Sequence, residues 1–234
     1  MYAVICAQDH HFLQLAHPIL TQNRKPHQRP VSMKRRVTTV RTLKQARAYV
    51  LQVRICGIFS DAGVGMPNLW EVVDLPHRQP GEKGWGQKVV AIWRWKNELP
   101  AVYPEEIFYG KIPTGHAVLM NMDHMRAEYY PKHYRPLSEC SPLAQRIYER
   151  LKLDPLTTGS LRKELNMTQR PERNRFDRAL QELQVTLNIA RRNSLEDEND
   201  TWVLFSDQYL DVVQTRTHGS NPAQGDSAKE RATP

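Results

Sequence analysis

The stretch PERNRFDRALQELQVTLNIARR, residues 171–192, decides the fold class of this 234-residue chain. Its first part carries apolar residues at the i, i+3, i+4 and i+7 steps of a helix with one core-facing side: Phe176, Ala179, Leu180 and Leu183. VTLNIARR at its end is typical of a strand, and a second strand-like run, TWVLF, follows the polar, acidic segment NSLEDEND. The stretch therefore predicts a helix from about Pro171 to Gln184 followed by a β-hairpin.

Two shorter helices are expected upstream of this stretch. Apolar residues recur at helical spacing in PLAQRIYERL, which ends before Pro155. Thr157 or Thr158 can cap the second helix, TGSLRKEL. Three helices followed by a β-hairpin is the order of a winged helix-turn-helix, which we expect at residues 142–210, with the short apolar piece YLDVV packed back on it.

The sequence of the first half predicts a basic arm and a mixed α/β unit at residues 33–135. Together with the winged helix expected at residues 142–210, this unit makes the predicted fold class α+β. Thr42 can cap a helix that ends near Gly57, and the turn formers that follow surround LWEVVDL, which is either a strand or a helical turn. Trp and basic residues alternate with period two in WRWK, residues 93–96, and a Pro-Thr-Gly turn separates IFYGKI from HAVLMNM. These three segments are predicted to be strands.

The positive charge of the chain is concentrated near its start. The formal net charge is +8 and the pI is near 9.5, and the residues from Tyr49 onward are neutral in sum. The arm is suited to contact backbone phosphates through Lys34, Arg35, Arg36, Arg41, Lys44 and Arg47. Residues 1–32 lack a sustained period, so we expect a disordered leader or an overextended start with Met33 as the true first residue. Residues 215–234 are expected to be a disordered tail.

Composition excludes several functional classes. No run approaches the roughly 20 consecutive apolar residues that a membrane-spanning helix needs. Cys6, Cys56 and Cys140 are widely spaced and form no CxxC pair, so neither a disulfide framework nor a structural zinc site is indicated. The opening segment MYAVICAQDHHFLQLAHPIL lacks the basic start of a signal peptide. We therefore expect a cytoplasmic protein without membrane contact, metal or small-molecule cofactor.

The predicted third helix carries the candidate binding site. Its start and the side opposite Phe176 present Arg170, Arg173, Asn174, Arg178 and Gln181. The donors and acceptors of Arg, Asn and Gln suit guanine and adenine edges in the major groove, where a recognition helix presents its N-terminal face. Arg191 and Arg192, at the end of the first hairpin strand, are candidates for phosphate contact.

A second interpretation of this helix stays open. Most exposed helix faces are polar because water lies opposite, and Asp177 and Glu182 dilute the positive charge. The hairpin loop carries acids that would repel phosphate: Glu196, Asp197, Glu198 and Asp200. The sequence is therefore compatible with DNA contact and also with a protein-interaction or purely structural winged helix.

Three further patterns each allow two interpretations. WRWK could stack on nucleobases, or it could be an ordinary element with one buried and one wet face. Gly63-Val64-Gly65 is more typical of a turn than of a phosphate-binding loop. A metal site can be imagined from His116, Asp123, His124 and His133, although their spacing matches no known site.

Segments from both halves resemble a known family. WRWKNELP, IFYGKIPTGHAVLMNM, RFDRALQELQVTLNI and TWVLF occur in this order and resemble bacterial proteins described as related to AlkZ. Those proteins are grouped with the YcaQ/AlkZ winged-helix crosslink-repair DNA glycosylases, and the likeness covers roughly Val40 to Leu210. The resemblance implies a winged helix, DNA as the partner and a relation to enzymes that hydrolyse the N-glycosidic bond of damaged nucleotides.

The resemblance transfers no catalytic residue. The glycosylases are larger, with tandem winged helices, and use a Gln-aliphatic-Gln or Gln-aliphatic-Asp motif. QELQ at residues 181–184 has a different spacing, and Gln8-Asp9 lacks the intervening residue. Hydrolysis needs a polar group that holds water, and the central acids, each also interpretable as a surface carboxylate, are Glu98, Glu105, Glu106 and Asp123.

We therefore expect a DNA-binding winged-helix protein related to these glycosylases, possessing or lacking their catalytic activity. An active DNA glycosylase on alkylated or crosslinked bases is one alternative. A transcription regulator or protein-interaction module is the other, and the acidic hairpin loop is the feature that supports it.

Overall fold

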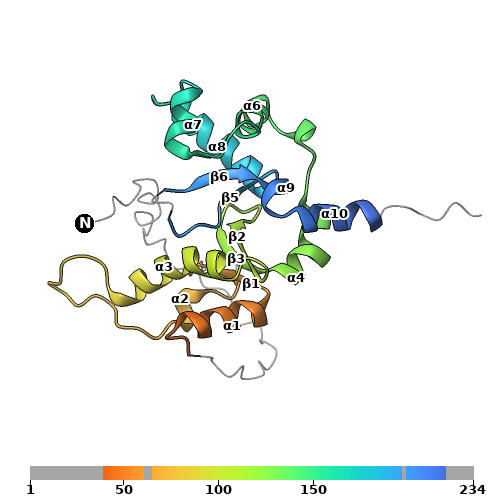
Figure 1. Ribbon diagram of the computed structural model, residues 1–234. Coiled ribbons are helices and arrows are strands. Elements are labelled where there is room, and N and C mark those ends of the chain that lie inside the picture. The colour runs from red at the N-terminus through yellow and green to blue at the C-terminus, as the bar shows by residue number, and fades with distance from the viewer. Residues whose placement is uncertain (1–38, 61–64, 197–198, 220–234) are drawn as a thin grey trace, which may run out of the picture.

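The computed structural model describes residues 39–60, 65–196 and 199–219 (Figure 1). Within these ranges the fold is α+β, with helices packed around two small antiparallel sheets. The first half contains α1 (Leu43–Val53), β1 (Ile55–Gly57), α2 (Leu69–Val72), α3 (Gln87–Val102), β2 (Ile107–Lys111), β3 (Ala117–Asn121), α4 (Met122–His124), the π-helical turn η2 (Met125–Tyr129) and α5 (Tyr130–His133). The second half contains η3 (Leu137–Glu139), α6 (Pro142–Leu151), β4 (Leu156–Thr157), α7 (Thr158–Glu164), α8 (Glu172–Val185), β5 (Ile189–Arg191), β6 (Thr201–Leu204), α9 (Phe205–Gln208) and α10 (Leu210–Gly219).

The first half is organised by the sheet β1-β3-β2. The predicted strands IFYGKI and HAVLMNM are confirmed as β2 and β3, which pair antiparallel across the Pro-Thr-Gly turn. The side chain of Thr42 accepts a hydrogen bond from the backbone N–H of Gln45 and so caps α1, as expected. The helix ends at Val53, however, and Gly57 lies in β1. LWEVVDL contains the helical turn α2, which Asn68 caps.

The prediction of a strand at WRWK is wrong, because residues 93–96 lie inside the 16-residue helix α3. The alternation is a local feature of a longer helical pattern. Its buried apolar residues recur at helical steps: Ala91, Ile92, Trp95 and Leu99. Trp95 is therefore a core residue with 2% of its surface exposed, whereas Trp93 is only partly buried.

The second half follows the predicted order of three helices and a hairpin. β4, between α6 and α7, pairs with β6, and β6 pairs with β5, so the sheet order is β4-β6-β5. Thr157 rather than Thr158 caps α7, and Pro171 precedes α8 instead of occupying its first turn. The apolar side of α8 packs on α6, with Phe176 and Leu183 fully buried.

A third apolar cluster lies between the two halves. The ring of Phe108 in β2 lies 6.1 Å from that of Phe205 and 5.5 Å from that of Tyr209. Leu187, just after α8, is buried in the same cluster with a left-handed φ of 58°. YLDVV therefore does pack back, but it packs on this shared cluster, which also holds Val212.

Several predictions concern the ends of the described ranges. Residues 1–32, Lys34, Arg35, Arg36, Gly63 and Val64 lie outside the described residues. The helix α10 continues to Gly219, past the expected boundary at Thr215, and the remainder of the predicted tail is also outside them. None of the helices described by the structure combines the length and the apolar character needed to cross a membrane.

Candidate nucleic-acid interface

The connection between α7 and α8 places the start of α8 at the surface. Asn166 adopts a left-handed φ of 57°, which asparagine tolerates better than most residues. This conformation lets the N–H of Met167 donate to the carbonyl of Arg162 at 2.8 Å and closes the end of α7. The chain then reverses through residues 168–171 into α8, whose first two turns remain largely exposed.

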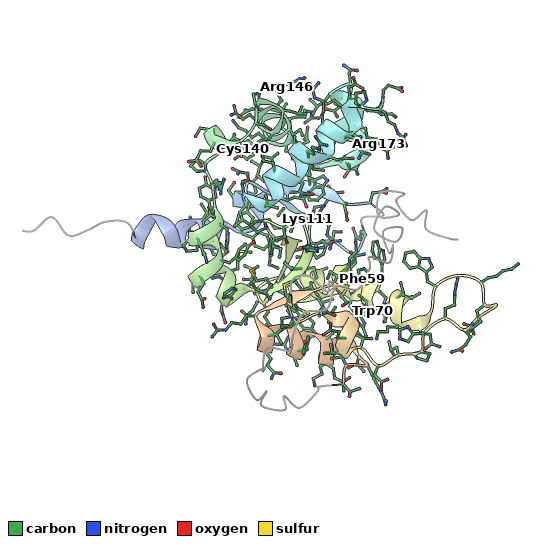
Figure 2. All side chains as sticks on the ribbon, turned by 180° about the vertical axis from the view of Figure 1, so that it is seen from behind. Phe59, Trp70, Lys111, Cys140, Arg146 and Arg173 are labelled. Atoms are coloured by element: carbon green, nitrogen blue, oxygen red, sulfur yellow. The ribbon has the colours of Figure 1, made fainter. Side chains whose placement is uncertain are left out.

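Arginine is concentrated on this exposed start of α8. Four arginines there are exposed and make no ion pair with another described residue: Arg170, Arg173, Arg175 and Arg178. Asn174 is exposed among them. Figure 2 shows Arg173 at the edge of the molecule. We call this set, with Asn174, the α8 arginine cluster.

The two acids of α8 that dilute the charge in the sequence are hydrogen-bonded to other residues of the second half. Asp177 accepts a hydrogen bond from Arg162, whose side chain is 10% exposed. Glu182 accepts hydrogen bonds from the backbone N–H of Ser141 at 2.9 Å and from its hydroxyl at 2.5 Å. Glu182 therefore joins the end of α8 to the start of α6. Of the carboxylates of α8, only Glu172 remains beside the arginine cluster without a described partner.

Gln181 is partly buried, beside the turn between β2 and β3 of the first half. It lies two turns further along α8, where the turn between β2 and β3 approaches the helix. A Cβ at Gly115 would lie 2.9 Å from Nε2 of Gln181, and Gly115 has a φ of 88° that favours glycine. The structure thus brings Arg170, Arg173, Asn174 and Arg178 together and places Gln181 at their margin.

The two hairpin arginines lie in different environments. Arg191 is 7% exposed, donates hydrogen bonds to Asn97 of α3 and to Asp200, and holds its guanidinium 4.5 Å from the ring of Tyr109. It therefore bridges the two halves and is not presented to solvent. Arg192 is exposed beside a hollow of about 340 Å³ near β4 that Glu196 also lines. Neither lies in the α8 arginine cluster.

The four central carboxylates are all paired with arginines. Glu106 binds Arg47 through contacts of 2.5 and 2.7 Å, and these hydrogen bonds hold the pKa of its carboxyl below the usual range. Glu98 lies 3.3 Å from Arg94, while Glu105 and Asp123 lie 3.7 and 3.5 Å from Arg126. None of the four lines either of the two cavities described here. The structure assigns no water-holding role to any of them.

The histidines do not assemble into a metal site. Among the described residues, no group of three or more His, Cys, Asp or Glu side chains is placed to bind a metal ion. His116 contacts Thr114 at 2.7 Å, and the ring of His133 lies 4.3 Å from that of Tyr129. His124 and His133 line a largely apolar cavity of about 400 Å³ whose described lining contains no carboxylate.

The comparison with protein families decides the relationship. The model of the family described as AlkZ related matches residues 40–206, more than two thirds of the chain. The chain belongs to the AlkZ-related family. The match spans both sheets and the whole of α8, so the AlkZ-related region includes the arginine cluster. No curated protein and no solved structure among those compared matches the chain.

Sequence reasoning missed two groups within the AlkZ-related region. The tie between Glu182 and Ser141 has no spacing signature, because the two residues are 41 positions apart. Phe59, Trp70 and Trp85 lie in loops and a single helical turn, where no period selects them. Their only signal is composition, since three of the five tryptophans fall within residues 70–93.

Proposed function

We propose that this AlkZ-related protein binds duplex DNA through a winged helix-turn-helix at residues 142–210, with the start of α8 in the major groove. Two features support the architecture. The three helices precede a hairpin, and the sheet order β4-β6-β5 places the strand between the first two helices beside the returning hairpin strand. We place this binding in the cytoplasm, where a chain with free, buried cysteines such as Cys56 and Cys140 is stable.

The observation that carries the proposal is that the α8 arginine cluster is exposed and makes no ion pair with any residue of the described ranges. Arginine binds guanine O6 and N7 with two parallel hydrogen bonds, and asparagine binds adenine N6 and N7. Arg173, Asn174 and Arg178 present these groups from one exposed helix segment, and Arg170 beside them is suited to a phosphate. Gln181 contributes at most at the edge of the groove because the β2–β3 turn adjoins it.

The hairpin has a smaller part in this proposal. Arg191 acts as a bridge between the halves, since its guanidinium faces Asn97 and Tyr109. Arg192 remains a candidate phosphate contact because it is exposed. The proposal includes no hydrolysis of the N-glycosidic bond, because each central carboxylate is held by an arginine.

The test is charge reversal on α8. Arg173→Glu/Arg178→Glu should abolish binding of a labelled blunt duplex measured by fluorescence anisotropy, and the circular dichroism spectrum should stay that of the wild type. Because each phosphate contact contributes about 0.9 to the slope of log affinity against log salt, Arg170→Gln should lower that slope by about 0.9.

The matched control is Lys132→Glu/Arg146→Glu. Both residues are exposed and lie on α5 and α6, so the net charge changes equally while α8 is untouched (Figure 2 shows Arg146). This control should retain most of the duplex affinity. Equal losses in both double variants would show a general charge effect and would refute the assignment of α8.

A further inference from the structure

Four aromatic side chains form a continuous row on the first half of the protein. The ring centroids of Trp70 and Phe59 are 6.0 Å apart, those of Phe59 and Trp93 are 6.4 Å apart, and those of Trp93 and Trp85 are 5.9 Å apart. We call these four residues the aromatic row. They come from the loop after β1, from α2, from the loop before α3 and from α3, so the row is assembled by the fold and is not a sequence repeat.

The row is presented at the surface. Phe59 and Trp85 are 41% and 43% exposed, and Trp70 and Trp93 are partly buried. The loop before α3 holds Trp85 in place, because a Cβ at Gly86 would lie 2.2 Å from the backbone nitrogen of Arg78. Only glycine allows this return of the chain. Large exposed aromatic rings placed in mutual contact are unusual on a surface without a ligand.

Two lysines lie beneath the rings. Nζ of Lys96 is 3.7 Å from the ring centre of Trp93, and Nζ of Lys88 is 4.7 Å from that of Trp70. Both residues are more than nine-tenths buried, at 6% and 8% exposure. Neither forms an ion pair with a carboxylate of the described ranges. Neither Nζ is among the fully buried side-chain nitrogens, so each ammonium group remains accessible to an anion while the ring covers its apolar stem.

The carboxylates close to the row in sequence contact residues other than these two lysines. Glu71 lies 3.4 Å from the hydroxyl of Ser60, and Glu98 is held by Arg94. Exposed ring faces, combined with positive charges that have no ion-pair partner in the described ranges, are complementary to one kind of ligand. Unpaired nucleotides offer a flat base for each ring and a phosphate for the cations, and they bind proteins in this manner without strong sequence preference.

We propose that the aromatic row, with Lys88 and Lys96, is a stacking site for unpaired bases of single-stranded or gapped DNA. The proposal rests on the proposed function for the identity of the ligand as DNA and adds a second site to it. The row continues toward the hairpin, since Lys96 and Arg191 both lie over the ring of Tyr109. Figures 1 and 2, which view opposite sides, both place α3 and the start of α8 toward the same lateral edge of the molecule.

The experiment compares single-stranded and duplex probes. Phe59→Ala/Trp85→Ala removes two exposed rings without opening the core. Since each stacked ring contributes roughly fivefold to a hundredfold in affinity, the variant should bind a fluorescein-labelled oligothymidylate at least about tenfold more weakly than the wild type. Its affinity for a blunt duplex should be unchanged. Phe59→Tyr/Trp85→Tyr keeps aromatic faces and should restore the affinity for oligothymidylate.

The matched control is Val102→Ala/Leu153→Ala, which removes two exposed apolar side chains elsewhere and should change neither affinity. An oligothymidylate affinity that is equal in wild type and Phe59→Ala/Trp85→Ala overturns the proposal. So does a variant that alters only the oligomeric state in light scattering, because the row then belongs to a contact between copies. Loss of duplex binding in Arg173→Glu/Arg178→Glu is scored separately, so failure of either site is distinguishable from failure of the other.

Discussion

The substitution Arg191→Met separates the charge of this side chain from its packing. In the folded protein its guanidinium donates to Asn97 and Asp200 and lies over Tyr109, while Nε and one terminal nitrogen have no hydrogen-bond partner among the described residues. Methionine keeps an unbranched apolar stem of similar length and removes the charge. The substitution therefore tests whether the charge or the packing of Arg191 holds the halves together.

The expected magnitude follows from these contacts. A hydrogen bond to a charged group contributes about 1.5–3 kcal/mol. A cation–π contact adds about 0.5 kcal/mol at an exposed site and about 2 kcal/mol at a buried one. Each buried N–H group without a partner costs about 1–3 kcal/mol, and Arg191 carries such groups on two nitrogens. The stabilisation from the contacts of the guanidinium and the cost of its nitrogens without a partner nearly cancel. We therefore expect Arg191→Met to lie within about 1 kcal/mol of the wild type in the free energy of unfolding.

Arg191→Ala should be clearly less stable, because it also removes a stem that is buried against α3 and β2. The two methylene groups Cγ and Cδ, together with the cavity that the side chain leaves, correspond to about 3 kcal/mol. For a chain of this size that is roughly 6–12 °C in the midpoint of thermal unfolding. Differential scanning calorimetry of the wild type and both variants measures the difference directly.

The same variants decide whether Arg191 touches DNA. With the fold intact, Arg191→Met should bind a blunt duplex as the wild type does, with an unchanged dependence on salt. If Arg191→Met is as unstable as Arg191→Ala, the charge is essential and the cancellation argued above is incorrect. If it is stable but binds duplex with a salt slope lower by about 1, Arg191 contacts a phosphate in the complex.

Two further substitutions test other contacts. Glu182→Ala removes both hydrogen bonds to Ser141 and should lower the free energy of unfolding, measured by urea titration, by about 2 kcal/mol. The affinity for duplex DNA should stay unchanged. Stronger duplex binding would instead show that Glu182 faces the DNA. Burial, reinforced by neighbouring cations, lowers the pKa of His133 in the folded state. The unfolded chain therefore binds the proton more readily, and stability should fall as the pH drops below about 6.5. His133→Phe should flatten that part of the stability profile measured by thermal unfolding, and an unchanged profile would contradict the assignment.

The elements that the sequence predicts well are those with a long, regular pattern. Phe176 and Leu183 belong to a run of helical steps long enough to define the buried side of α8, and Thr42 sits directly before such a run in α1. Capping and periodicity agree at both places, so local preference and tertiary packing lead to the same structure. The β2–β3 hairpin has the same agreement between its turn and its strands.

The failure at WRWK has a physical reason. Period two over four residues is compatible with a helix when the flanking residues supply the core contacts, and burial of Ile92 and Leu99 fixes the helical register. Trp93 and Trp95 then fall on different sides, one toward the aromatic row and one into the core. A window that includes the residues on both sides of the tetrapeptide favours the helix.

The candidate site could be predicted only as far as a single helix defines it. The wheel of α8 separates its exposed residues from its buried ones, which is why Arg173 and Arg178 are found together. The environment of Gln181 and Arg191 depends on the β2–β3 turn and on Asn97, which come from the other half of the chain. Contacts over such separations leave no periodic trace in the sequence.

The apolar cluster shared by the two halves also limits the geometry that bound DNA can adopt. Phe108 from one half packs against Phe205 and Tyr209 from the other, so the start of α8 and the aromatic row are attached to a common core. Within the described residues, this shared core sets the distance between them. A DNA molecule that contacted both surfaces would have to supply the deformation itself, and the sequence-dependent stiffness of the DNA would then contribute to which sites are bound.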